Sequence, residues 1–298
     1  MKVVESRQEL QRLADEVRAR GQRIALVPTM GALHAGHLSL IAAVRAAGAT
    51  RIVVSIFVNP MQFAAHEDLS KYPRTFDADL AACREGGADL VYAPMPDVMY
   101  PSGFQTHVEV ERITRAFEGA IRPEHFRGVT TVVTKLFNAT GSCIAAFGRK
   151  DYQQLRCIER MVRDLDMPVR VLACAIVREP DGLALSSRNR YLNDAARSRA
   201  TALFRGLHAA SRAFARHERA TERLIALART PLERDFDSID YVAVVEPDQL
   251  QAQDELASER SVMLVAARIG GTRLIDNCEL GRECLEIPAA VASEEPST

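Results

Sequence analysis

Five short apolar runs alternate with helical segments along the first 177 residues, and this alternation restricts the fold more than any other feature. The runs are rich in valine, isoleucine, leucine and alanine, with no regular alternation of polar and apolar residues. Such runs are typical of strands that are buried on both faces of a parallel sheet. We predict strands at residues 24–27, 52–58, 89–92, 143–147 and 169–177, and helices at 6–20, 38–48, 75–86, 129–140 and 152–165.

The pattern changes near residue 178, which indicates a second domain. Strand–helix–strand units predict a Rossmann-like α/β domain over residues 1–177, with a parallel sheet covered by helices on both faces. A smaller α+β domain is expected over residues 178–283, and a disordered tail over 284–298. Within the smaller domain we predict an arginine-rich helix at 194–217, a shorter helix at 220–229, and strands at 239–245, 262–267 and 274–277.

The composition excludes several classes of protein. Lys and Arg number 38 against 39 Asp and Glu, so the net charge of −1 gives no general attraction to nucleic acid or anionic lipid. No run reaches the roughly 18 apolar residues of a membrane span, and the N-terminus lacks the apolar core of a signal peptide. The six cysteines show neither CxxC pairs nor zinc-like spacing, which indicates reduced core thiols. We therefore expect a cytoplasmic enzyme.

The loop after the first predicted strand carries two histidines three residues apart. Its sequence, residues 28–37, is PTMGALHAGH. If His34 and His37 both lie in a helix, they share one face near its N-terminus, where unpaired N–H groups attract anions. Gly31 and Gly36 allow a phosphate to approach the backbone closely. We predict an anion site here, although the two histidines could instead be polar residues satisfied beside a turn.

Polar residues also follow the later strands, at the edge of a parallel sheet where ligands usually bind. Side-chain amides can both donate and accept hydrogen bonds, while lysine, arginine and serine suit phosphate oxygens. Ordinary polar loops are the alternative interpretation, and Asp151 could simply cap the next helix. The candidates are Asn59 and Gln62 after the second strand, Lys150, Asp151 and Gln154 after the fourth, and Ser186, Ser187 and Arg188 after the fifth.

Taken together, these motifs resemble those of the pantoate–β-alanine ligases, within the HxGH nucleotidylyltransferase superfamily. The resemblance covers about residues 1–283. No GxxxxGK[ST] loop and no GxGxxG follows the first strand, which disfavours P-loop and dinucleotide-binding enzymes. The segments that carry the resemblance are VPTMGALHAGH (27–37), SIFVNPMQF (55–63), YPRT (72–75), FRGVTTVVTKLFN (126–138), FGRKDYQQL (147–155), DGLALSSRNRYL (181–192) and RLIDN (273–277).

The resemblance implies an ATP-dependent ligase of pantothenate and coenzyme A biosynthesis. Pantoate's carboxylate would attack the α-phosphate of ATP, releasing pyrophosphate. The amine of β-alanine would then attack the bound pantoyl adenylate, giving pantothenate and AMP. Mg²⁺ would be bound mainly by the ATP phosphates. The enzyme would be a homodimer.

The resemblance also implies roles for individual residues. His34, His37, Lys150, Ser186, Ser187 and Arg188 would be catalytic, and the smaller domain would close over ATP with its serine–serine–arginine loop. Met30, Asn59, Gln62 and Gln154 would bind pantoate or β-alanine. No protein metal site is predicted, although Asp79 could be an outer ligand of Mg²⁺. The ATP site would contain Met30, Gly31, His34, Gly36, His37, Gly148, Arg149, Lys150, Asp151, Val177, Leu185, Ser186, Ser187 and Arg188.

Two positions depart from the family pattern, and two other functions compete with the ligase. Arg149 stands where Glu or Gln is common, and Ala78 replaces an acidic residue found in some members, which weakens the metal role of Asp79. Another HxGH nucleotidylyltransferase, acting on a phosphorylated cofactor precursor, would need a second cationic site. A nucleotide-binding regulatory module would bind ATP without releasing pyrophosphate.

Overall fold

The chain forms two compact units, each with its own hydrophobic core. The computed structural model describes residues 1–63 and 69–281, and the division between the units falls between Ala175 and Ile176. The sequence placed this boundary two residues later, after residue 177. The predicted tail at 284–298 lies outside the described residues.

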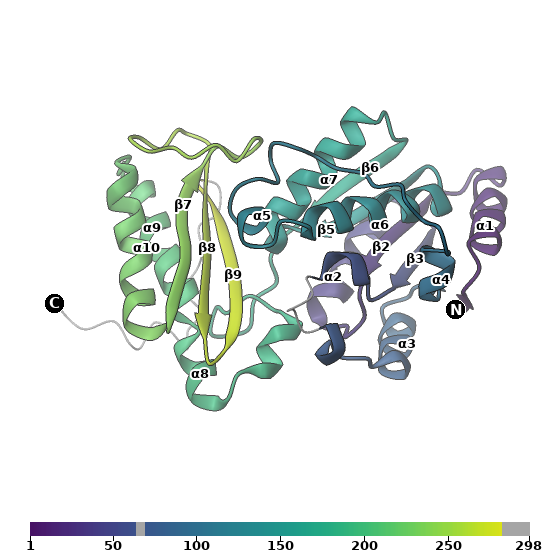
Figure 1. Ribbon diagram of the computed structural model, residues 1–298, viewed down its shortest axis with the longest axis horizontal. Coiled ribbons are helices and arrows are strands. Elements are labelled where there is room, and N and C mark those ends of the chain that lie inside the picture. The colour runs from purple at the N-terminus through teal and green to yellow at the C-terminus, as the bar shows by residue number, and fades with distance from the viewer. Residues whose placement is uncertain (64–68, 282–298) are drawn as a thin grey trace. The chain divides into compact units, whose positions relative to one another are not determined.

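The first unit is built on a six-stranded, all-parallel sheet with the strand order β1-β4-β3-β2-β5-β6 (Figure 1). From the central β2 the chain moves to β3 and β4 on one side, then returns to place β5 and β6 on the other. This arrangement confirms the Rossmann-like prediction. The strands are β1 (Lys2–Val4), β2 (Ile24–Thr29), β3 (Arg51–Ile56), β4 (Leu90–Tyr92), β5 (Cys143–Gly148) and β6 (Val169–Cys174).

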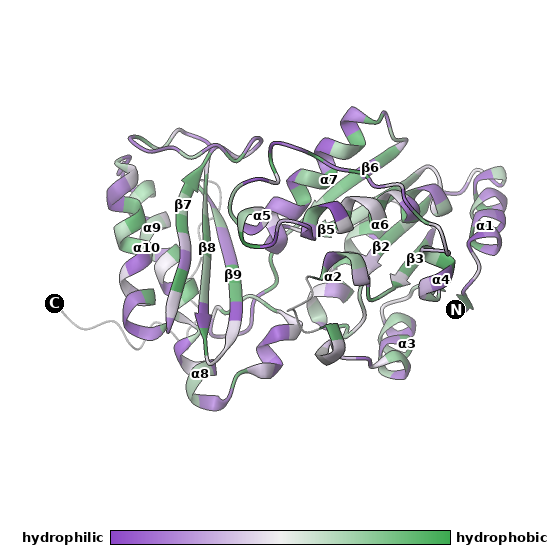
Figure 2. Cartoon of the chain, in the orientation of Figure 1, coloured by the Kyte–Doolittle hydropathy of each residue, from purple (hydrophilic) through white to green (hydrophobic). Residues whose placement is uncertain are grey.

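Helices cover both faces of this sheet, because successive residues of each strand point to opposite sides. On one face, Leu26 packs in a cluster with residues of α1, α6 and α7. On the other face, Ala25 and Val27 pack with residues of α2 and α3. The strands are accordingly apolar along most of their length (Figure 2). The helices are α1 (Arg7–Ala19), α2 (Ala35–Ala46), α3 (Phe76–Glu85), α4 (Pro96–Met99), α5 (Glu118–Ile121), α6 (His125–Thr140) and α7 (Tyr152–Asp164), with 3-10 turns η1 (Pro60–Gln62), η2 (Leu69–Lys71) and η3 (Arg149–Asp151).

The second unit packs helices against a three-stranded antiparallel sheet in the order β7-β8-β9, as the α+β prediction requires. The expected single helix at 194–217 is wrong, because the chain forms two helices that break around Thr201. The Thr201 hydroxyl donates to the carbonyl of Ser198 at 2.8 Å, a local bond that competes with regular helix geometry. The elements are η4 (Ser187–Tyr191), α8 (Asp194–Arg199), α9 (Ala202–Ala215), α10 (Thr221–Asp235), β7 (Ser238–Val245), β8 (Ser261–Ile269) and β9 (Thr272–Leu280).

The expectations about membrane spans and about cysteines can be compared with the described residues. None of their helices is long and apolar enough to cross a bilayer. Cys83, Cys143, Cys157, Cys174 and Cys278 are buried thiols, as the sequence predicted.

Candidate active site

The carboxyl ends of β2 and β5 mark the point where the strand order reverses. These two strands are neighbours, and the chain leaves them toward opposite sides of the sheet. Open parallel sheets bind ligands at such a point. Residues 30–37 leave the end of β2, while η3 leaves the end of β5 directly after Gly148. Two of the predicted segments therefore meet at the place where the fold favours a ligand.

The two histidines are held by a reciprocal cap at the start of α2. His34 is the N-cap, with extended backbone angles (φ −142°, ψ 176°), and His37 lies in the first turn. The backbone N–H of Gly36 donates to Nδ1 of His34 at 3.1 Å, and the N–H of His34 donates to Nδ1 of His37 at 3.3 Å. The ring centroids are 4.1 Å apart. The two histidines open α2 and their rings are adjacent, as predicted, although His34 caps the helix and only His37 lies within its first turn.

This cap fixes the tautomer of both rings. A nitrogen that accepts a backbone N–H carries no proton, so Nδ1 of each ring is unprotonated and Nε2 holds the proton. Burial, reinforced by the neighbouring His34 and Lys150, lowers the pKa of His37 to about 3, although Asp151 opposes the shift. At neutral pH His37 is thus a hydrogen-bond donor through Nε2 and carries no charge.

Asp79 holds the turn that precedes the histidines. Gly31 (φ +84°) and Ala32 (φ +51°) both have left-handed backbone, which is unfavourable for alanine. The buried carboxylate of Asp79 accepts the N–H of Ala32 at 3.0 Å and that of Leu33 at 2.8 Å. A Cβ atom at Gly31 would lie 2.9 Å from Asp79 Oδ2, so only glycine fits there.

The same contacts count against Asp79 as an outer metal ligand. Both of its oxygens already accept backbone N–H groups, and Oδ2 also accepts the Thr75 hydroxyl at 3.2 Å. Within residues 1–63 and 69–281, no group of three or more His, Cys, Asp or Glu residues could hold a metal ion. The sequence motif gave no sign of this clamp, because 46 residues separate Leu33 from its partner.

The loop after β5 brings charge to the histidines. The Lys150 side chain is mostly buried (16 % exposed), and its Nζ lies 3.7 Å from Oδ1 of Asp151. Both charges act on the pKa of His37, which Lys150 lowers and Asp151 raises. Asp151 precedes α7 but makes no side-chain capping bond, so the structure does not support the capping interpretation.

The buried amide of Asn59 is oriented by three partners. Its Nδ2 donates to the carbonyl of Gly128 at 3.1 Å, while its Oδ1 accepts the hydroxyl of Tyr100 at 2.8 Å and the N–H of Met61 at 3.3 Å. A carbonyl partner on one side and an N–H on the other exclude the flipped amide. Tyr100 was not among the predicted site residues, since it lies 41 positions away from Asn59.

Asn59 in turn orients Gln62. Its Nδ2 also donates to Oε1 of Gln62 at 3.1 Å, so the Gln62 carbonyl oxygen faces Asn59. Nε2 of Gln62 then points toward the thioether of Met30, 2.9 Å away. Sulfur is a weak acceptor, so Gln62 presents a donor amide beside Met30. Gln154 lies in the first turn of α7 and is partly buried.

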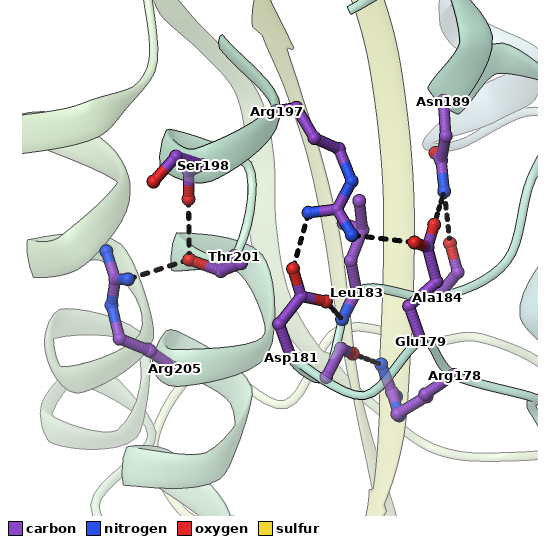
Figure 3. Close-up of polar contacts among 11 residues, drawn as sticks. Arg178, Glu179, Asp181, Leu183, Ala184, Asn189, Arg197, Ser198, Thr201 and Arg205 are labelled. Carbon is purple, nitrogen blue, oxygen red and sulfur yellow. Dashed lines mark hydrogen bonds and ion pairs between the residues drawn. The ribbon is translucent and has the colours of Figure 1, made fainter. Parts of the chain in front are cut away.

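The remaining candidates belong to the second unit. Val177 and Leu185 pair through their backbones, with the Leu185 N–H donating to the Val177 carbonyl at 2.9 Å. Ser186 is the N-cap of η4, and its Oγ accepts the N–H of Arg188 at 3.2 Å. Ser187 and Arg188 begin that turn and are partly exposed. Figure 3 shows Asn189, from the same turn, bonded to Glu179, which in turn contacts Arg197.

Comparison with known proteins identifies the family. A family model described as pantoate-beta-alanine ligase matches residues 2–279. The chain belongs to this family. Pantothenate synthetase from Geobacter sulfurreducens is 48 % identical over 95 % of the chain and 100 % of its own length, and that from Chloroherpeton thalassium is 45 % identical over 94 % and 99 %.

Solved structures agree with this family. Pantothenate synthetase from Thermus thermophilus is 41 % identical, with a TM-score of 0.88 over 94 % of this chain and 99 % of that one. A pantoate-beta-alanine ligase from Francisella tularensis is 29 % identical, with a TM-score of 0.76 over 95 % and 99 %. The chain is therefore a ligase that forms pantothenate from pantoate and β-alanine, and a different HxGH nucleotidylyltransferase is not favoured.

The neutral tautomer of His37 can be observed directly. Because its pKa lies near 3, lowering the pH from 8 to 5 should leave the ring neutral, with its proton on Nε2. Two-dimensional NMR of ¹⁵N-histidine-labelled protein reports both ring nitrogens, and a His37→Asn variant assigns the signal. Protonation of His37 within this pH range, or a proton on Nδ1, would contradict the account.

Replacing Asp79 with Asn tests the clamp. An asparagine can accept only one of the two backbone N–H groups, and its NH₂ would face the other. We expect a loss of about 1–3 kcal/mol in the free energy of unfolding, measured by urea and circular dichroism, together with reduced turnover. Asp77→Asn removes an exposed carboxylate from the same helical turn and is the matched control. Equal stability of the two variants would remove Asp79 from this role.

Proposed function

We propose that the residues at the ends of β2, β3 and β5 activate pantoate with ATP and then transfer it to β-alanine. The Francisella relative was solved in complex with beta-gamma ATP and beta-alanine, which supports both ligands for this chain. The observation that carries the proposal is the backbone-capped histidine pair at the switch point of the sheet. No protein nucleophile is required, since pantoate's own carboxylate attacks the α-phosphate.

In this proposal the imidazoles stabilise the charge that develops as pyrophosphate leaves. Nε2–H of His37, and that of His34 beside it, donate hydrogen bonds to phosphate oxygens. Donors fixed in advance stabilise a transition state without the cost of reorganising at the moment of reaction. Because His37 is neutral, it stabilises charge without giving up a proton, and the positive charge comes from Lys150.

The amide of Gln62 is proposed to bind pantoate. Its Nε2 is a donor, so it would face an oxygen of pantoate, while Met30 would contact the methyl groups of the substrate. Asn59 then acts through Gln62 as a positioning residue. Gln154, whose helix begins beside Asp151, would provide a second amide to the same substrate.

The triphosphate is proposed to contact Lys150, Ser186, Ser187 and Arg188. Hydroxyl, ammonium and guanidinium groups all donate to phosphate oxygens. Mg²⁺ would arrive as part of the substrate, carried by the phosphates and water. The nucleotide contacts assigned to Met30, Gly31, Gly36, Gly148, Arg149, Asp151, Val177 and Leu185, the homodimer and the cytoplasmic location remain predictions from the resemblance.

Pyrophosphate release tests the reaction itself. With ATP and pantoate but no β-alanine, we expect a single turnover of pyrophosphate release per active site. Adding β-alanine should convert this burst into steady turnover, with AMP and pantothenate in equal amounts. ATP consumption that requires a phosphorylated acceptor, or ATP binding with no pyrophosphate released, would refute the proposal.

Two substitutions at His37 separate its structural role from its catalytic one. In His37→Asn, Oδ1 can still accept the His34 N–H, but no donor reaches the position of Nε2. We expect the rate of adenylate formation to fall by roughly 10²-fold or more, the cost of losing one transition-state donor. His37→Gln places an amide NH₂ near the former Nε2 and should recover part of the rate. If His37→Asn retains the wild-type rate in stopped-flow pyrophosphate assays, His37 is not catalytic.

Removing the hydroxyl of Tyr100 tests the amide chain that ends at Gln62. Tyr100→Phe deletes one of the four hydrogen bonds of the Asn59 side chain, so we expect the KM for pantoate to rise about three- to tenfold, equivalent to roughly 1 kcal/mol, while the KM for ATP stays constant. Tyr92→Phe is the control, because Tyr92 is also buried and its hydroxyl lies 3.8 Å from the weak acceptor Met99 Sδ. Equal changes in both Michaelis constants would indicate a general structural effect instead.

A further inference from the structure

A tight turn precedes the segment Ser186–Arg188 and is bonded to elements on both sides of it. The turn spans residues 178–185 and closes with the Glu179 N–H donating to the Leu183 carbonyl at 2.8 Å. Figure 3 shows Glu179 and Asp181, the two carboxylates of the turn, converging on Arg197, which belongs to α8. These residues are not among the site residues that the sequence predicted, so their arrangement needs an explanation of its own.

Arg197 bridges two carboxylates of the turn. Its Nη1 donates to Oδ2 of Asp181 at 2.6 Å, and its Nη2 donates to Oε2 of Glu179 at 2.7 Å. Burial alone would raise the pKa of Asp181, but the hydrogen bond and charge of Arg197 outweigh it and hold that pKa below its usual value. The planar fork of a guanidinium suits this double contact, which a lysine cannot reproduce.

Glu179 extends the contact to the residue that follows Arg188. Its second oxygen, Oε1, accepts Nδ2 of Asn189 at 2.9 Å, and the same Nδ2 donates to the Ala184 carbonyl at 3.1 Å. Both partners are acceptors, so the orientation of the Asn189 amide is settled. The Asn189 N–H also donates to the Ser186 carbonyl at 3.1 Å. Ser186–Arg188 is therefore held at its C-terminal end by a chain of contacts that leads through Glu179 to Arg197.

The base of the turn is anchored to the core of the second unit. Arg178 donates through Nη1 and Nη2 to the two oxygens of Asp276 on β9, at 2.6 and 3.1 Å, and the Asp276 side chain is fully buried. Gly182 packs against the ring of Phe204 so closely that a Cβ atom would lie 2.4 Å from it. The turn is thus a firm support against which Arg197 can hold the following segment.

We propose that Glu179 and Arg197 are positioning residues that hold Ser186–Arg188 in its phosphate-binding conformation before ATP arrives. This inference rests on the proposed function, in which that segment contacts the triphosphate. A loop that is already ordered before ATP binds loses less conformational entropy on binding, so its affinity for ATP is higher. The Arg197, Glu179 and Asp181 side chains are 25 %, 27 % and 31 % exposed, so solvent weakens these ion pairs, and the melting temperature separates any contribution to folding from the positioning role.

Arg197→Lys is the test, with Arg205→Lys as its matched control. Lysine keeps the positive charge but cannot bridge Asp181 and Glu179. Arg205 has a similar exposure of 23 % and likewise joins two partners, Thr201 and Asp235, away from the turn. In Arg197→Lys we expect the KM for ATP to rise roughly three- to tenfold, with the KM for pantoate and the melting temperature unchanged. In Arg205→Lys we expect no change in either KM.

Asn189→Ala and Arg188→Ala complete the experiment. Asn189→Ala removes the hydrogen bond from Asn189 to Glu179, at the opposite end of this series of contacts from Arg197. It should raise the KM for ATP as Arg197→Lys does. Arg188→Ala should weaken ATP use at least as much, since it removes a proposed phosphate contact. If Arg188→Ala impairs the enzyme but Arg197→Lys and Asn189→Ala do not, the positioning role is refuted while the proposed function stands. If Arg188→Ala also has no effect, the proposed contact of this segment with the triphosphate is refuted, and the positioning role is refuted with it.

Discussion

The active site depends on which side chains accept the backbone N–H groups at and just before the start of α2. A helix N-terminus leaves several N–H groups without partners in the helix itself. Here two of them, from His34 and Gly36, donate to imidazole nitrogens, and two just before them, from Ala32 and Leu33, donate to Asp79. In many helices a serine or aspartate side chain accepts these unpaired N–H groups. In this protein they orient two imidazoles and fix which ring nitrogen carries the proton.

The rest of the site applies the same principle to other groups. Gln62 and the Ser186–Arg188 segment are both held by groups that are not themselves proposed to meet substrate. Asn59 orients Gln62, and Asn59 is itself fixed by Tyr100 and the carbonyl of Gly128. In the second unit, Glu179 reaches the residue that follows Arg188. Such a supporting shell is what a reaction without a protein nucleophile requires, since positioning and charge stabilisation then supply the catalysis.

The sequence predicted the layout of the sheet well and the supporting contacts poorly. Apolar runs revealed five of the six strands of the first unit, because burial on both faces leaves a composition that is visible locally. The edge strand Lys2–Val4 was not predicted, because it has three residues and only Val4 is buried. The positions of His34 and His37 were evident from their motif, but the motif suggested a shared helix face, whereas His34 is the cap. Asp79 and Tyr100 could not have been placed, because their partners lie 46 and 41 residues away and nothing in the local pattern of either marks the contact.

The most direct test of the central claim is a crystal structure with a non-hydrolysable ATP analogue, at a resolution that defines the imidazole rings. The account predicts that Nε2 of both His34 and His37 lies within hydrogen-bond distance of phosphate oxygens, about 2.7–3.2 Å, while both Nδ1 atoms keep their backbone N–H donors. A triphosphate bound away from the end of β2, or an imidazole turned so that Nδ1 faces the phosphate, would contradict it.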